Sequence, residues 1–182
     1  MSKPSIDVLS YVSADIARAA RTASESLRKH GVRHALCGGL AVGAYGHVRA
    51  TKDVDFLVGP EAFVGDPDGL VEFAPGVPFR IGSIPTDSVP IPKDLPGLIS
   101  ALESPDDLDG MPIISPEALV CMKLVAHRRK DQLDVIELLK AGATTLPKVK
   151  ALLSSAAASS AIVASLGDRL DELDRLAQDG AE

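Results

Sequence analysis

Two aspartates one residue apart, Asp53 and Asp55, open DVDFLVG, the clearest strand-like segment of the chain. Residues i and i+2 of a strand point to the same side, about 6.5–7 Å apart. Two carboxylates on one side of a buried strand repel each other and lose hydration, so the pair needs nearby positive charge. A divalent cation that prefers oxygen ligands, Mg²⁺ or Mn²⁺, meets that need. The alternative is that both aspartates lie in a solvated loop before the strand.

A pair of glycines, Gly38 and Gly39, precedes these aspartates and follows a short strand-like segment. Glycine lets a backbone approach a phosphate closely, and the start of a helix offers free N–H groups to it. Between the glycines and the aspartates lie Arg49, Thr51 and Lys52, which could contact a triphosphate or a nucleic-acid phosphate. The alternative for these residues is ordinary surface. The pattern is neither a Walker loop nor a dinucleotide fingerprint, since no Lys-Ser/Thr follows the glycines and G-x-G-x-x-G is absent.

Short strands and helices are predicted on both sides of this segment. The stretch 5–31 is amphipathic and ends in cations followed by Gly31, a common helix C-terminal signal. VRHALCGG predicts a strand and LAVGAYG a short helix or turn. The stretch 65–96 is dense in Pro and Gly and contains the strand-like pieces FRIGSI and DSVPI. LPGLISALES predicts a short helix and MPIIS a last strand.

A pair of helices is predicted after this strand. SPEALVCMKLVAHR has Ser115 as N-cap, Pro116 at the first position and Glu117 in the first turn. KDQLDVIELLKAG predicts the second helix, which ends at Gly142.

The tail predicts further helices joined by an Ala/Ser-rich stretch, with leucines at 166, 170, 173 and 176 in helical spacing. This leucine stripe either covers the same chain or forms a homodimer interface. The order of elements predicts an α/β (α+β) fold with a small mixed sheet flanked by helices. We expect this domain to span 1–142 and a C-terminal helical extension to span 143–182.

Composition narrows the function. The net charge of −6 argues against a broad basic face for nucleic acid, and 3% aromatic residues leave few rings for stacking bases. Cys37 and Cys121 lie far apart among apolar neighbours without ligand spacing, which argues against zinc and predicts free thiols in a reducing cytosol. The N-terminus lacks a signal pattern and no apolar run reaches the ~18 residues of a membrane span. We therefore expect a cytoplasmic protein without a membrane partner.

At this point the residues suggest a family. GGLAVGAYGHVRATKDVDFLV resembles the nucleotidyltransferase superfamily that shares its fold with DNA polymerase beta. The closest resemblance is to the small bacterial branch that includes toxin–antitoxin and abortive-infection nucleotidyltransferases. SPEALVCMKLVAHRRKDQLDVIELL is similar to a second segment of that branch, in which a lysine on one helix is followed by Lys-Asp at the start of the next. Together the similar segments span about 32–139.

The resemblance implies roles for individual residues. Asp53 and Asp55 would bind Mg²⁺ or Mn²⁺, and Asp87 is the best match for the family's third carboxylate, as a ligand and a base. Lys123 would reach toward phosphate, although its helix position also allows a solvent-exposed face. Gly38 and Gly39 would hold the nucleotide phosphates, and Asp131 would lie near the site. Arg49 and Lys52 are candidates for nucleotide contacts through their charge and their place between the glycines and the aspartates, independently of the resemblance. Gly39 departs from the serine of many relatives and lacks its hydroxyl.

The implied reaction is transfer of NMP from an NTP to a hydroxyl acceptor with release of pyrophosphate. The acceptor could be a tRNA end, a protein or a small molecule, and the protein could belong to a toxin–antitoxin system. The alternative is an inactive fold that binds a nucleotide or a partner, motivated by the loose match of Asp87. A third reading is a scaffold in which the aspartate pair has no function.

Overall fold

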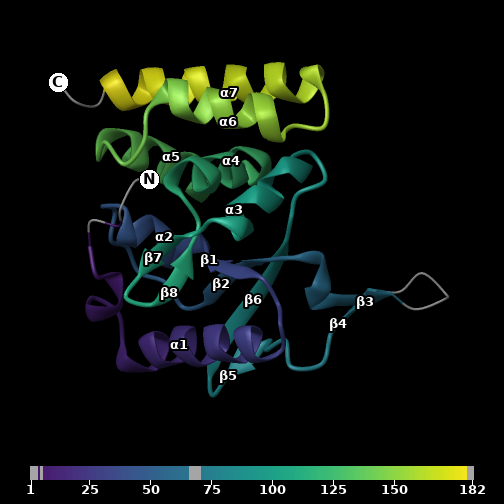
Figure 1. Ribbon diagram of the computed structural model, residues 1–182. Helices are drawn as coiled ribbons and strands as arrows, with labels where there is room; N and C mark the ends of the chain where they lie inside the picture. The colour runs from purple at the N-terminus through teal and green to yellow at the C-terminus, as the bar shows by residue number, and fades with distance from the viewer. Residues whose placement is uncertain (1–3, 5, 66–70, 180–182) are drawn as a thin grey trace.

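The computed structural model describes residues 4, 6–65 and 71–179 of the chain (Figure 1). At its centre is a six-stranded sheet in the order β5-β6-β2-β1-β8-β7. Adjacent strands pair in parallel for β2–β6 and β1–β8, and antiparallel for β1–β2, β5–β6 and β7–β8. The predicted mixed sheet is therefore confirmed. Its strands are β1 (His34–Leu36), β2 (Val54–Val58), β5 (Arg80–Ile81), β6 (Ile84–Pro90), β7 (Asp106–Leu108) and β8 (Met111–Ile113).

Helices cover the two faces of this sheet unequally. Helix α1 (Ala14–Lys29) packs alone on one face, and α2 (Gly38–Ala44) and α3 (Ser100–Glu103) lie on the other. The pair α4 (Pro116–Ala126) and α5 (Arg129–Lys140) lies beyond α2, and the pair α6 (Leu146–Ala156) and α7 (Ser160–Asp179) packs on that layer in turn (Figure 1). Short 3₁₀ turns complete the chain at Val8–Ser10, Pro60–Ala62 and Pro96–Ile99.

Two of the predicted helices, α1 and α4, begin at the caps that their sequences predict, and α1 also ends at its predicted glycine signal. Ser13 caps α1 by accepting a hydrogen bond from the N–H of Ile16, and Gly31 follows the helix with φ +71°. Ser115 caps α4 in the same way, with Pro116 at the first helical position. These local signals need no tertiary partner, which explains why the sequence predicts them well.

Alternation along β2 separates its two faces. The ring of Phe56 meets that of His34 edge-on at 5.4 Å, and His34 Nε2 bonds Ser24 of α1 at 2.8 Å. Phe56 therefore faces α1. Since neighbouring residues of a strand point to opposite faces, Asp55 points away from α1, toward the side on which α2 and α4 lie.

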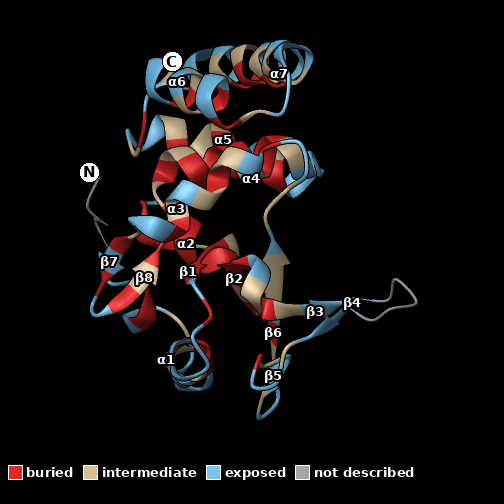
Figure 2. Ribbon diagram, turned by 45° about the vertical axis from the view of Figure 1, so that its right-hand side comes forward, coloured by how far each residue is buried: buried red, intermediate tan, exposed pale blue. Residues whose placement is uncertain are grey.

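The leucine stripe of the tail is turned mainly inward. Leu166, Leu170 and Leu173 are buried, and α7 packs against α5 and α6, whereas Leu176 is 50% exposed. Figure 2 shows the same division between a buried and an exposed side of α7. Three of the four leucines thus cover the chain itself. The homodimer and the boundary at residue 142 stay predictions, and a dimer through α7 would have to use its outer face.

Several short strands were not predicted from the sequence. They are β7 and the separate two-stranded ribbon of β3 (Phe63–Gly65) and β4 (Val71–Phe73). β7 begins with two aspartates and β3 is mostly exposed, so both lack the apolar residues that identified β1 and β8, strands of the same length. The exposed pattern of β4 gives no core signal either. Both cysteines are free and buried, as predicted. Within the described ranges, no helix has the length and hydropathy needed to cross a bilayer.

Candidate active site

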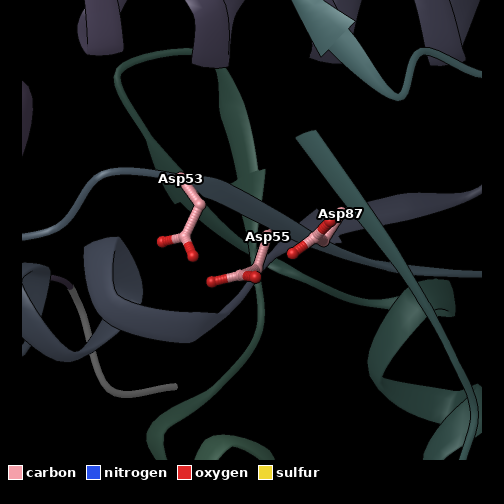
Figure 3. Close-up of side chains that lie close together, drawn as sticks. All are labelled: Asp53, Asp55 and Asp87. Carbon is pink, nitrogen blue, oxygen red and sulfur yellow. The ribbon is translucent and has the colours of Figure 1, made fainter. Parts of the chain in front are cut away.

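Strand pairing brings a third carboxylate beside the aspartate pair. β2 and β6 run parallel with Asp55 opposite Asp87. Asp53, Asp55 and Asp87 each offer an oxygen, and these oxygens lie within 4.8 Å of one another. Figure 3 shows the three carboxylates converging, Asp53 from the bend just before β2, Asp55 from β2 and Asp87 from β6. The alternative of a loop before the strand therefore holds for Asp53 and not for Asp55. The sequence predicted this trio, but only the register of β6 places Asp87 in it.

The first glycine lies directly against this carboxylate group. The N–H of Cys37 donates to the backbone carbonyl of Asp55 at 2.8 Å, which joins the end of β1 to β2. Gly38 has φ +61°, a conformation that favours glycine. A Cβ at Gly38 would lie 1.7 Å from Asp55 Oδ2, so glycine is required by conformation and by space. The predicted neighbourhood of the glycine bend and the aspartates is therefore present.

The negative charge of Asp55 is unfavourable in this site, because nearby positive charge does not fully offset it. Burial first, and then the charges of Asp53 and Asp87, raise its pKa from 3.8 to about 6. The charge of Lys123 and a hydrogen bond from the backbone of Gly39 act in the opposite direction and do not offset these effects. The pKa shift shows that ionising all three carboxylates costs free energy in the protein alone.

The donor set fits a divalent cation. Three carboxylate oxygens within 4.8 Å of one another can share a cation with little movement, and hard oxygen ligands suit Mg²⁺ or Mn²⁺. A cation would also relieve the repulsion that raises the pKa of Asp55. The geometry thus supports a metal site at these residues and leaves the identity of the metal open.

The carboxylates open into a cleft between β6, α4 and the start of α5. Its volume is about 320 Å³. One part is polar, with the carboxylates and the glycines, and the other is aliphatic. The lining residues are Cys37, Gly38, Gly39, Arg49, Asp53, Asp55, Asp87, Val89, Pro92, Leu119, Met122, Lys123, Val125, Ala126, Arg128, Lys130 and Asp131. Most of the predicted site residues therefore line one cleft.

Lys123 is a buried member of this cleft. Its Nζ lies 2.9 Å from Asp131 Oδ1 and 2.8 Å from Asp134 Oδ2, and its side chain is only 8% exposed. The alternative in which Lys123 lies on a solvent-exposed helix face is therefore wrong. α4 packs against α5 at this position, so the outward face that the helical spacing allowed is covered.

The same network fixes the start of α5. Arg128 Nε donates to Asp131 Oδ2 at 2.6 Å. Burial by itself would raise the pKa of Asp131, but the hydrogen bonds from Arg128 and Lys123 outweigh it and lower the pKa. Asp131 therefore stays ionised and holds two cations at the edge of the cleft.

The other two predicted cations, Arg49 and Lys52, differ in whether they line the cleft. Arg49 lines the cleft and donates to Asp134 through Nε at 2.8 Å and Nη2 at 3.0 Å. Lys52 is exposed and does not line the cleft, so its contact with a nucleotide stays a prediction without support from its position. Asp134 was missed altogether. The sequence pattern that could have identified Asp134 is its position three residues after Asp131, on the same side of a helix.

Comparison with known proteins adds little to this geometry. No protein-family model and no curated protein matches the chain. Among solved structures, the chain is similar to an antigenic nucleotidyltransferase-like protein from Paracoccidioides brasiliensis, with a TM-score of 0.37 and 16% sequence identity over 88% of this chain and 98% of that one. A likeness of this size assigns neither a fold family nor an activity, so any function has to be argued from the residues of the cleft.

Proposed function

We propose that the protein is a metal-dependent nucleotidyltransferase, which transfers NMP from an NTP to a hydroxyl acceptor. The observation that carries the proposal is the convergence of Asp53, Asp55 and Asp87 beside Gly38 in a cleft that also contains cations. Phosphoryl transfer depends mainly on positioning and on the stabilisation of charge. This arrangement offers both.

Each group has a defined task in this proposal. Asp53, Asp55 and Asp87 would hold Mg²⁺ or Mn²⁺, which supplies positive charge for the acceptor hydroxyl and for the departing pyrophosphate. The acceptor oxygen attacks the α-phosphorus, the bond from that phosphorus to the bridging oxygen breaks, and pyrophosphate leaves. The acceptor proton passes to Asp87, the most exposed of the three carboxylates. Lys123, Arg49 and the glycines would contact the phosphates.

The inactive-fold alternative loses its motivation. It was based on the loose match of Asp87, and Asp87 lies opposite Asp55 with its carboxylate in the same group. The choice among a tRNA end, a protein and a small molecule as acceptor stays open, as do the toxin–antitoxin role and a cytoplasmic location.

The test is a transfer assay with each of the four α-labelled NTPs against total tRNA and against the protein itself, in Mg²⁺ and in Mn²⁺. We expect metal-dependent labelling of one acceptor by the wild type. Asp55→Asn and Asp87→Asn should abolish it, whereas Asp168→Asn, which removes an exposed carboxylate on α7, should leave it intact. Transfer by Asp55→Asn at the wild-type rate would refute the proposal.

A further inference from the structure

The second glycine is not required by its backbone. Gly39 lies in the first turn of α2 and is absent from the residues with positive φ. Alanine is favoured over glycine in a helix by about 1 kcal/mol, so the backbone alone would favour a larger residue here. Another feature must keep this position without a side chain.

That feature is the space beside Gly39, which two polar side chains fill. A Cβ at Gly39 would lie 3.0 Å from Thr51 Oγ1 and 3.4 Å from both terminal nitrogens of Arg49. The Thr51 hydroxyl would have to shift by a few tenths of an ångström to admit the Cβ, whereas the distance to Arg49 is close to ordinary contact. Hydrogen bonds hold both neighbours in place. Arg49 is held by two hydrogen bonds to Asp134. Thr51 donates from Oγ1 to Asp53 Oδ1 at 2.9 Å.

The bond from Thr51 has a direct bearing on the carboxylate group. A hydroxyl has a single proton to donate, and Thr51 Oγ1 has two acceptors in reach, Asp53 Oδ1 at 2.9 Å and the backbone carbonyl oxygen of Asp53 at 3.3 Å. The shorter contact is the one to the carboxylate, which belongs to the trio. Hydrogen bonds to a ligating carboxylate orient it and affect the affinity for the metal. A side chain at Gly39 would push against the oxygen that makes this bond.

We propose that Thr51 is a positioning residue for the metal ligand Asp53, and that Gly39 lacks a side chain so that the Thr51 hydroxyl can hold its place. The inference rests on the proposed function, because it takes the three carboxylates as the metal site. Thr51 does not touch the reacting atoms in this view. It acts by fixing the carboxylate of Asp53.

The test measures Mn²⁺ affinity directly, by electron paramagnetic resonance titration of the full chain without nucleotide. Thr51→Val keeps the shape and removes the hydroxyl, so its Kd for Mn²⁺ should rise about tenfold. Thr51→Ser keeps the hydroxyl and should stay within about twofold of the wild type. Thr145→Val is the matched control, because Thr145 is exposed at the start of α6 and its side chain makes no capping bond.

A second pair of variants tests the role of Gly39 and remains informative if Thr51→Val does not fold. Gly39→Ala should weaken Mn²⁺ binding about fivefold to tenfold. In a Thr51→Ala background, which removes the crowded hydroxyl, the same change at Gly39 should weaken binding by less than twofold. Thermal unfolding in EDTA shows which variants are folded.

The outcomes separate the inference from the function on which it rests. Equal Mn²⁺ affinity of wild type, Thr51→Val and Gly39→Ala would overturn the inference and leave the metal site standing. Equal losses from Gly39→Ala in both backgrounds would overturn the role of Gly39. A wild-type protein that binds no Mn²⁺ would overturn the proposed metal site together with the inference.

Discussion

Asp55→Asn should make the metal-free protein more stable, and only at a pH where Asp55 is ionised. The pKa of Asp55 is about 6, against an ordinary value of 3.8, because burial and two neighbouring carboxylates disfavour its charge. Each pKa unit corresponds to about 1.4 kcal/mol, so ionised Asp55 lowers the free energy of unfolding by at most about 3 kcal/mol. Asparagine has nearly the same size without the charge. Since it accepts a weaker hydrogen bond from Gly39, we expect a net gain of about 2 kcal/mol.

The sign of the pH dependence follows from proton binding. Between pH 3.8 and about 6 the folded state binds more protons at Asp55 than the unfolded state does. The stability of the wild type therefore falls as the pH rises through this window, because of this group. The advantage of Asp55→Asn should be absent near pH 4, grow up to about pH 6 and stay constant above it.

Thermal unfolding in EDTA at several pH values measures this effect. For a chain of 182 residues, 2 kcal/mol corresponds to an increase in Tm of about 4–8 °C at pH 8. Asp168→Asn, on the exposed side of α7, should show no such increase. With Mg²⁺ added, the wild type should gain stability and Asp55→Asn should not. A gain in EDTA that is equal at pH 4 and pH 8 would refute the electrostatic explanation.

Three other variants test separate parts of the structure. Gly38→Ala should lower the free energy of unfolding by more than about 2 kcal/mol and weaken Mn²⁺ binding. The control is Gly82→Ala, at φ +60° in open space, which should cost only the backbone strain of about 1–2 kcal/mol. Unfolding measures the change in stability, and Mn²⁺ titration measures the change in affinity. Lys123→Met leaves two buried aspartates without their shared cation, so the free energy of unfolding in urea should fall by about 3–5 kcal/mol. The control is Lys150→Met, which breaks a half-exposed ion pair and should lower this free energy by less than about 1 kcal/mol. Arg33 donates to Glu61 through Nε and Nη2, and this lowers the pKa of Glu61 to about 2. Wild type should therefore be more stable than Glu61→Gln above about pH 4.5, and the difference should disappear as the pH falls toward 2. A difference that persisted at pH 2 would contradict this assignment.

The sequence predicted those parts of the fold that local chemistry determines. The ends of α1 and α4, the strand after Asp53 and the helical tail all carry caps, periodicity or an apolar run within a few residues. β7, β3 and β4 carry none: β7 begins with two aspartates and β3 and β4 are mostly exposed, so they lack the apolar residues that identified the equally short β1 and β8.

The candidate site divides in the same way. Asp53, Asp55 and Gly38 lie in one stretch of sequence, and their residue types alone suggested a phosphate and a cation. The burial of Lys123 and the role of Asp134 depend on how α5 packs against α4, a contact that no local pattern encodes. Gly39 was expected to lack a hydroxyl, but Thr51 brings one to within 3.0 Å of the position of the missing Cβ.

Under the proposed function, the pairing of charges in the cleft would make metal binding and nucleotide binding interdependent. Arg49, Lys123 and Arg128 are each bonded to Asp131 or Asp134, so these cations already offset carboxylates of α5. The trio consists of Asp53 just before β2, Asp55 on β2 and Asp87 on β6, and burial together with the repulsion among the three raises the pKa of Asp55 although Lys123 acts against it. A triphosphate is itself a polyanion and would be repelled by this trio unless divalent cations accompany it. Thermodynamic linkage then requires that an NTP raise the affinity for Mg²⁺ by the same factor by which Mg²⁺ raises the affinity for the NTP.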